Sequence, residues 1–200
     1  MIQFCDREIT GERLLLDSKT ELYYLGHNLT LRNCTLVVKV PARALVISHT
    51  RLIDCSIELK QELKGFRWHS VSLKGCRFTG ALKGCEFGRW PDEADAEFGD
   101  IEDCDFSGAR LEACRFLLCD ARTLKFPSWP CFTLLDPVRH KHELLAAQWP
   151  GTVHIAVKSF LESPLETAAV TYSATALARR SDTTEDAIRA VLEKLDGVKL

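Results

Sequence analysis

A six-residue pattern, Leu/Ile-x-x-Cys-x-Leu/Ile/Phe, occurs six times between residues 31 and 116 of this chain. Six of the nine cysteines occupy the same place in it, namely Cys34, Cys55, Cys76, Cys85, Cys104 and Cys114. The first three copies are spaced by 21 residues, and the later gaps are 9, 19 and 10 residues. A fixed period near 20 residues is typical of a solenoid, in which each coil buries its apolar side chains against the next coil. The sequence therefore predicts a stack of coils.

A shorter period of five residues is present within the coils from residue 101 onward. Apolar residues stand at Ile101, Phe106, Leu111, Phe116, Ala121 and Phe126, and a small or apolar residue precedes each by two positions: Gly99, Cys104, Ala109, Cys114, Cys119 and Leu124. Neither a helix nor an ordinary strand repeats every five residues. A backbone that turns a corner every five residues has this period. Each stretch between two corners forms one flat face, and four faces would close a coil of about 20 residues. Both sets of side chains are therefore expected to point inward.

This pattern resembles that of the pentapeptide-repeat family, whose right-handed, four-sided β-helix has a large central residue and a small one two positions earlier. Residues 104–108 and 109–113 fit that motif residue by residue, and the resemblance extends over roughly residues 26–130. It implies a mainly β fold built as a right-handed β-helix. The 21-residue spacing implies one inserted residue per coil in the first half, which could also be a less regular β-helix. Residues 89–97 break the phase and are expected to loop out.

The chain is predicted to have three parts. Residues 1–25 are expected to be an N-terminal cap or entry segment over the open end of the solenoid, and residues 26–130 to be the β-helix. Two prolines, Pro127 and Pro130, end the period because they cannot donate hydrogen bonds to a β ladder. Residues 131–200 are predicted to form an α-helical C-terminal region, with helices at 136–148, 164–180 and 184–195. Residues 152–157 could be a strand or the start of a helix that reaches residue 161.

The last two expected helices have the arrangement of a helix-turn-helix. A helix that reads DNA should present basic or amide side chains near its N-terminus, whereas this one opens with Thr184-Glu185-Asp186. We therefore expect no direct nucleic-acid binding. The two helices are predicted to pack against the end of the solenoid, or to join two copies in a homodimer.

Composition favours a cytoplasmic protein. No apolar run approaches the roughly 18 residues that span a bilayer, and the first residues lack the basic-then-apolar pattern of a signal peptide. Most cysteines lie inside the repeat, which favours reduced core thiols over an iron–sulfur or disulfide role. The paired Cys-x2-Cys ligands of zinc sites are missing. We expect no metal, no cofactor and no membrane contact.

One segment has a pronounced charge. The net charge of the chain is only −2, yet eight acidic residues and no base lie between Arg89 and Arg110. They are Asp92, Glu93, Asp95, Glu97, Asp100, Glu102, Asp103 and Asp105. Such a run can steer and select a basic protein partner, and we predict that it forms the partner-binding surface. The alternative is a solvated loop, and the ordered spacing of a calcium-binding loop is missing.

Motifs of catalysis are sparse. The sequence contains no phosphate-binding Gly-rich loop followed by Lys-Ser/Thr, no Gly-x-Ser-x-Gly and no His-Glu-x-x-His. We therefore predict a non-enzymatic, protein-binding chain, specifically an inhibitor or immunity protein that neutralises a cognate toxin or enzyme. The family resemblance implies an alternative, because some pentapeptide-repeat proteins resemble duplex DNA and bind type II topoisomerases. Residues 1–130 hold 19 acids and 18 bases, which does not favour a uniformly negative rod. A generic interaction scaffold is the third alternative.

Overall fold

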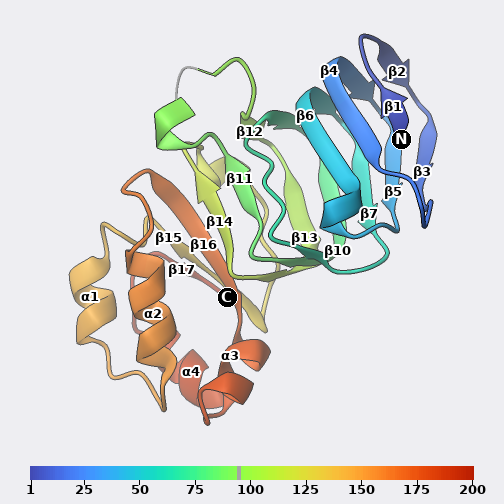
Figure 1. The fold of residues 1–200 in the computed structure, drawn as a ribbon. Coiled ribbons are helices and arrows are strands. Elements are labelled where there is room, and N and C mark those ends of the chain that lie inside the picture. Colours follow the sequence, from blue (N-terminus) through green and yellow to red (C-terminus); the bar gives the residue numbers. More distant parts are fainter. Residues whose placement is uncertain (94–95) are drawn as a thin grey trace.

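The computed structural model describes residues 1–93 and 96–200. Parallel strands stack into a β-solenoid of about four turns, and a smaller unit that contains the α-helices follows it (Figure 1). The N-terminus lies at the end of the solenoid that is remote from the C-terminal unit.

Two parallel sheets of six strands form two walls of the solenoid. The first has the order β1 (Ile2–Phe4), β4 (Tyr23–Arg32), β6 (Leu45–Ile53), β9 (Val71–Lys74) and β12 (Ile101–Glu102). Strand β2 (Glu8–Thr10) also pairs with β4. The second has the order β13 (Asp105–Glu112), β10 (Arg77–Lys83), β7 (Ser56–Leu59), β5 (Thr35–Val38) and β3 (Arg13–Leu16). Strand β8 (Leu63–Lys64) also pairs with β10. The order of strands in each sheet follows the order of the coils, as in a solenoid.

The six-residue pattern marks one kind of corner. The residue before each patterned cysteine has a positive φ, between 51° and 62°, at Asn33, Asp54, Gly75, Gly84, Asp103 and Ala113. Asn, Asp and Gly tolerate this left-handed backbone best, which explains their use here. The corners are also bonded between coils, since the Asp54 N–H donates to the Lys74 carbonyl at 2.8 Å and the Gly75 N–H donates to the Glu102 carbonyl at 3.1 Å.

The stacking begins earlier than the sequence indicated. β1 and β2 pair in parallel with β4, and β3 pairs in parallel with β5. The segment expected to be a separate cap is thus itself the first coil. Short 3₁₀ turns lie between strands, at η1 (Ala42–Ala44), η2 (Pro91–Glu93) and η3 (Ala121–Thr123).

Stacked thiols line the interior. The Cys55 thiol donates to the Leu31 carbonyl and the Cys76 thiol to the Leu52 carbonyl, each at 3.3 Å and each to the preceding coil. The hydrogen bond between Cys76 and Cys104, together with burial, raises the pKa of Cys76 to about 12. All nine cysteines lie in the described residues and are free. The seven buried ones therefore act as small core side chains, with their S–H groups directed at backbone oxygens.

Aromatic rings fill the wider part of the core. Phe78 stacks on Phe106 with 4.6 Å between ring centroids, and Phe87 stacks on Phe116 at 4.9 Å. The two stacks meet edge to face, as Phe106 and Phe116 show at 5.2 Å and 80°. All four side chains are fully buried. The inward orientation predicted from the period of five is confirmed at Phe106, Leu111 and Phe116 and at the small positions between them.

A third sheet joins the solenoid to the C-terminal unit. Its order is β11 (Glu86–Gly88), β14 (Cys114–Leu117), β16 (Thr167–Ser173), β15 (Cys131–Leu135) and β17 (Val198–Lys199). β11 and β14 belong to successive coils and are parallel, whereas β16 is antiparallel to both β14 and β15. The wall of the solenoid thus continues without a break into the following unit.

The C-terminal unit is therefore not only helical. Its helices are α1 (Lys141–Ala146), α2 (Val153–Leu161), α3 (Ala174–Arg180) and α4 (Glu185–Leu192). The prediction of a helix over residues 164–180 is wrong in its first half, which is strand β16. This strand is buried on both faces, so its near-continuous apolar run resembles that of a buried helix. Thr184 caps α4 by accepting a hydrogen bond from the Ala187 N–H at 3.1 Å.

A second hydrophobic core holds this unit together. It contains residues from every part of the unit, including Phe132, Leu144, Val157, Leu177 and Ile188. Helices α3 and α4 therefore pack within the C-terminal unit and against its sheet.

Candidate protein-binding surface

The acidic segment leaves the solenoid as a projecting loop. The chain departs after β11, passes through η2 and returns at β12, and we call residues 89–93 and 96–100 the acidic loop. Figure 1 shows it standing away from the body of the solenoid on the side of β11 and β12. This agrees with the expectation that residues 89–97 loop out, of which residues 94 and 95 lie outside the described part of the chain.

The returning end of the acidic loop is fixed to the solenoid. The side chain of Phe98 is 5% exposed and lies edge to face with His49, 5.4 Å between centroids. The Arg51 guanidinium carbon is 4.4 Å from the centroid of the same ring, which is a cation–π contact. Gly99 has φ 104°, and a Cβ there would lie 2.2 Å from the His69 carbonyl oxygen. Only glycine allows this close approach.

Four of the eight predicted site carboxylates meet a base on the folded surface. Glu97 pairs with Arg51, and Glu102 pairs with Lys74. Asp100 lies 2.8 Å from Arg89, and Asp105 lies 3.8 Å from Arg77. Arg51, Lys74 and Arg77 come from preceding coils, so the sequence run that lacks bases acquires them from its neighbours in space.

The other four carboxylates differ from these. Asp92 and Asp103 are exposed, and neither forms an ion pair with any described residue. Asp103 stands at a corner, where its N–H donates to the Thr123 hydroxyl at 3.3 Å. Glu93 is the last residue of η2, and Asp95 lies outside the described residues. The structure thus places Glu97 and Asp100 on the returning end of the acidic loop, Glu102 on β12, Asp103 at the following corner and Asp105 on β13 in the other wall.

Local hydrogen bonds keep the Asp105 carboxylate charged. The Ser107 hydroxyl donates to its Oδ1 at 2.5 Å, and this hydrogen bond lowers the pKa of Asp105. The ion pair with Glu102 raises the pKa of Lys74 in the same way.

The repeat itself contains the signal for these ion pairs. Lys74 and Glu102 both stand two places before a patterned cysteine, as do Lys83 and Glu112, which are 2.8 Å apart. In a stack of coils, residues at the same position of the repeat lie side by side on neighbouring strands. The strand register shows this, because Lys74 is opposite Glu102 and Lys83 is opposite Glu112. Lysine and glutamate at equivalent positions were thus visible in the sequence, but the sequence analysis did not pair them.

One ion pair in the same system is buried. Glu86 and Arg115, each one place after a patterned cysteine, lie 2.6 Å apart, and the Glu86 side chain is 8% exposed. Arg67 approaches the other carboxylate oxygen at 3.4 Å. Two guanidinium groups therefore balance one buried carboxylate.

Among the described residues, no three His, Cys, Asp or Glu side chains gather as a metal site, and no helix has the length and apolar character to cross a membrane. A scan against protein-family models found no match for this chain, and a search of curated proteins likewise found none.

Proposed function

We propose that this chain is a non-catalytic, protein-binding inhibitor or immunity protein that neutralises a cognate toxin or enzyme. One observation carries the proposal: a charged loop projects from a tightly packed solenoid and is fastened to it through Phe98, Gly99 and Asp100. A loop held by a rigid scaffold loses little conformational entropy when it docks, which favours tight inhibition.

The proposed partner has a basic surface. Asp92 and Asp103 offer carboxylates without an internal base, and Glu97 and Asp100 remain 73% and 61% exposed despite their ion pairs. Exposed carboxylates of this kind raise the rate of association with a positively charged protein and select against acidic ones. Bases of neighbouring coils stand beside carboxylates along the solenoid, so its surface is not uniformly negative and this proposal is better supported than mimicry of DNA.

We also assign the solenoid to the pentapeptide-repeat type of β-helix and the protein to the cytoplasm. The two inward side chains per face, with one small residue two places before a large one, support the first assignment. Nine free cysteines, seven of them buried, support a reducing compartment.

The test is affinity capture from lysate of the source organism with wild type and two variants. In the first variant Asp92→Lys and Asp103→Asn remove the unpaired charges, and asparagine retains the tolerance for positive φ. The control variant, Glu12→Lys with Glu162→Gln, makes the same change of net charge at exposed sites elsewhere. A stoichiometric partner should be retained by wild type and control and lost by the first variant.

The captured partner must also be inhibited. Adding the purified wild-type chain should abolish the partner's toxic or enzymatic activity, and the first variant should not. The proposal is wrong if the partner binds both variants equally, or if bound partner keeps its full activity. Reversal of Glu102 or Asp105 is avoided, because either change would place two bases side by side across the coils.

A further inference from the structure

A groove runs along the outer face of the solenoid and reaches the C-terminal unit at one end. Two adjoining hollows of about 530 Å³ and 610 Å³ form it, and both are lined by Glu62, Ser107, Ala109 and Arg110. The first continues over Leu59 and Gly80, and the second reaches Ser128, Thr175 and Arg179. Each volume falls in the range of about 300–1,000 Å³ that is usual for ligand sites. We call this the inter-unit groove.

The floor of the inter-unit groove is made of small residues. Gly80, Ala81, Gly108 and Ala109 line the first hollow, so little side-chain bulk covers the backbone there. Gly80 has φ 99°, and a Cβ on it would lie 2.2 Å from the Leu59 carbonyl oxygen. β13 is also the last strand of its sheet, apart from the single bridge between Asp105 and Lys125, and Ser107, Ala109 and Arg110 border both hollows. An extended chain can therefore approach the backbone of an edge strand.

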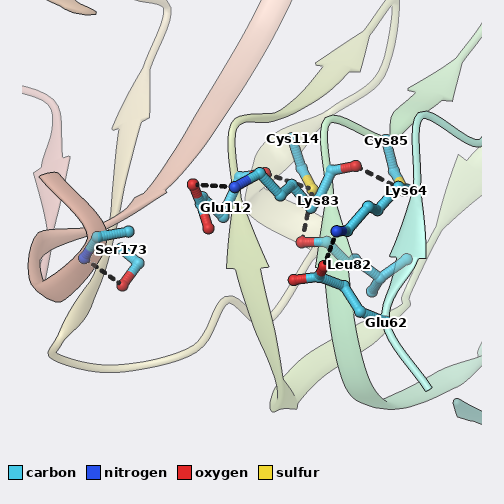
Figure 2. A network of polar contacts seen from close by, with 9 residues as sticks. Glu62, Lys64, Leu82, Lys83, Cys85, Glu112, Cys114 and Ser173 are labelled. Carbon is cyan, nitrogen blue, oxygen red and sulfur yellow. Dashed lines mark hydrogen bonds and ion pairs between the residues drawn. The ribbon is translucent and has the colours of Figure 1, made fainter. Parts of the chain in front are cut away.

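The charge of the inter-unit groove is positive. Its two carboxylates are already neutralised, because Lys64 lies 3.0 Å from Glu62 and Lys83 lies 2.8 Å from Glu112 (Figure 2). Lys60 is likewise paired, with Glu58 at 2.9 Å. Arg110 and Arg179 are exposed, and neither forms a hydrogen bond or ion pair with a described residue. Two guanidinium groups thus face the groove without a counterion.

We propose that the inter-unit groove binds an extended, acidic segment of a partner protein. Arginine pairs with carboxylates through two parallel hydrogen bonds, so Arg179 would hold one acidic side chain in the second hollow and Arg110 another where the two hollows meet. The floor of small residues in the first hollow accepts the backbone of the segment beyond Arg110. This goes beyond the proposed function, because the groove is separate from the acidic loop and selects the opposite charge.

The test begins with selection from a phage-displayed library of random peptides on the immobilised full-length chain. The selected peptides should be enriched in Asp and Glu. The best one, labelled with fluorescein, should bind wild type in an anisotropy titration, and its counterpart with Lys in place of every acid should not. Arg110→Glu with Arg179→Glu should weaken binding by about tenfold or more. Arg110→Gln with Arg179→Gln, which removes the charges without reversing them, should weaken it less.

The matched control is Arg43→Glu with Arg139→Glu, the same change of charge at exposed arginines outside the groove. It should bind the peptide as wild type does. The proposal is overturned if selection yields no acidic peptides, if the control weakens binding as much as the groove variant, or if a single-stranded oligonucleotide binds more tightly than the peptide. The readout does not involve the partner of the acidic loop, so failure here and failure of the proposed function are distinguishable.

Discussion

Phe106 has ring neighbours on every side within the solenoid. It stacks on Phe78 and meets Phe87 and Phe116 edge to face, with 5.1 Å and 5.2 Å between centroids. Aromatic pairs of this geometry contribute about 0.5–1.5 kcal/mol beyond the area that they bury. One side chain therefore links three others that lie far apart in the sequence.

Removing this ring should open a cavity that the neighbours cannot fill. We expect Phe106→Ala to lower the free energy of unfolding by about 3–5 kcal/mol, because interlocked rings on adjacent coils have little room to relax. Urea denaturation followed by circular dichroism measures the change. Leu165→Ala, at a side chain that is 68% exposed, serves as control and should stay within about 0.5 kcal/mol of wild type. An equal loss in the two variants would contradict the inward placement of Phe106.

At the scale of elements, strand register decides which charges meet. Glu86 pairs with Arg115 across β11 and β14, and Lys74 pairs with Glu102 across β9 and β12. The two pairs have the same origin in the repeat but differ in environment. The Glu86 side chain is 8% exposed, whereas that of Glu102 is 50% exposed.

This difference predicts unequal stabilities for two isosteric substitutions. Glu86→Gln should lower the free energy of unfolding by about 1–3 kcal/mol, because it leaves two arginines without their shared carboxylate. Glu102→Gln should cost below about 1 kcal/mol, since water and salt screen an exposed pair. Parallel urea titrations of the two variants test this. The interpretation fails if Glu102→Gln is the more destabilising of the two.

The elements also show what a single sequence can reveal. The inward side chains followed from the period of five, and the projecting loop followed from the break in its phase. The left-handed corner before each patterned cysteine was not predicted. The bases that meet Glu97, Glu102 and Asp105 lie on other coils, and only the register brings them together. Strand β16 was missed because its partners, β14 and β15, lie 32 or more residues away in sequence, and a short apolar run by itself fits a helix equally well.

At the scale of the molecule, the solenoid and the C-terminal unit share one sheet. β16 lies between β14, whose Phe116 belongs to the solenoid core, and β15, whose Phe132 belongs to the second core. Separating the units would leave the edges of β14 and β15 without their partner. Unpaired backbone groups of a buried strand are unfavourable, so the shared sheet should couple the stabilities of the two cores.

We therefore expect the whole chain to unfold in a single transition. Trp68 is fully buried among Phe66, Phe78 and Phe87 in the solenoid, and Trp149 packs against the second core, where its ring N–H donates to the Leu144 carbonyl at 2.7 Å. Variants that keep only one of these tryptophans, with the other three replaced by Phe, report on each unit by fluorescence during urea denaturation. The midpoints of the two should coincide with each other and with circular dichroism, because β16 cannot leave one core while the other stays intact. Two separate midpoints would mean that the antiparallel pairing of β14 with β16 is weak enough to break alone, and the C-terminal unit would then be an independent domain.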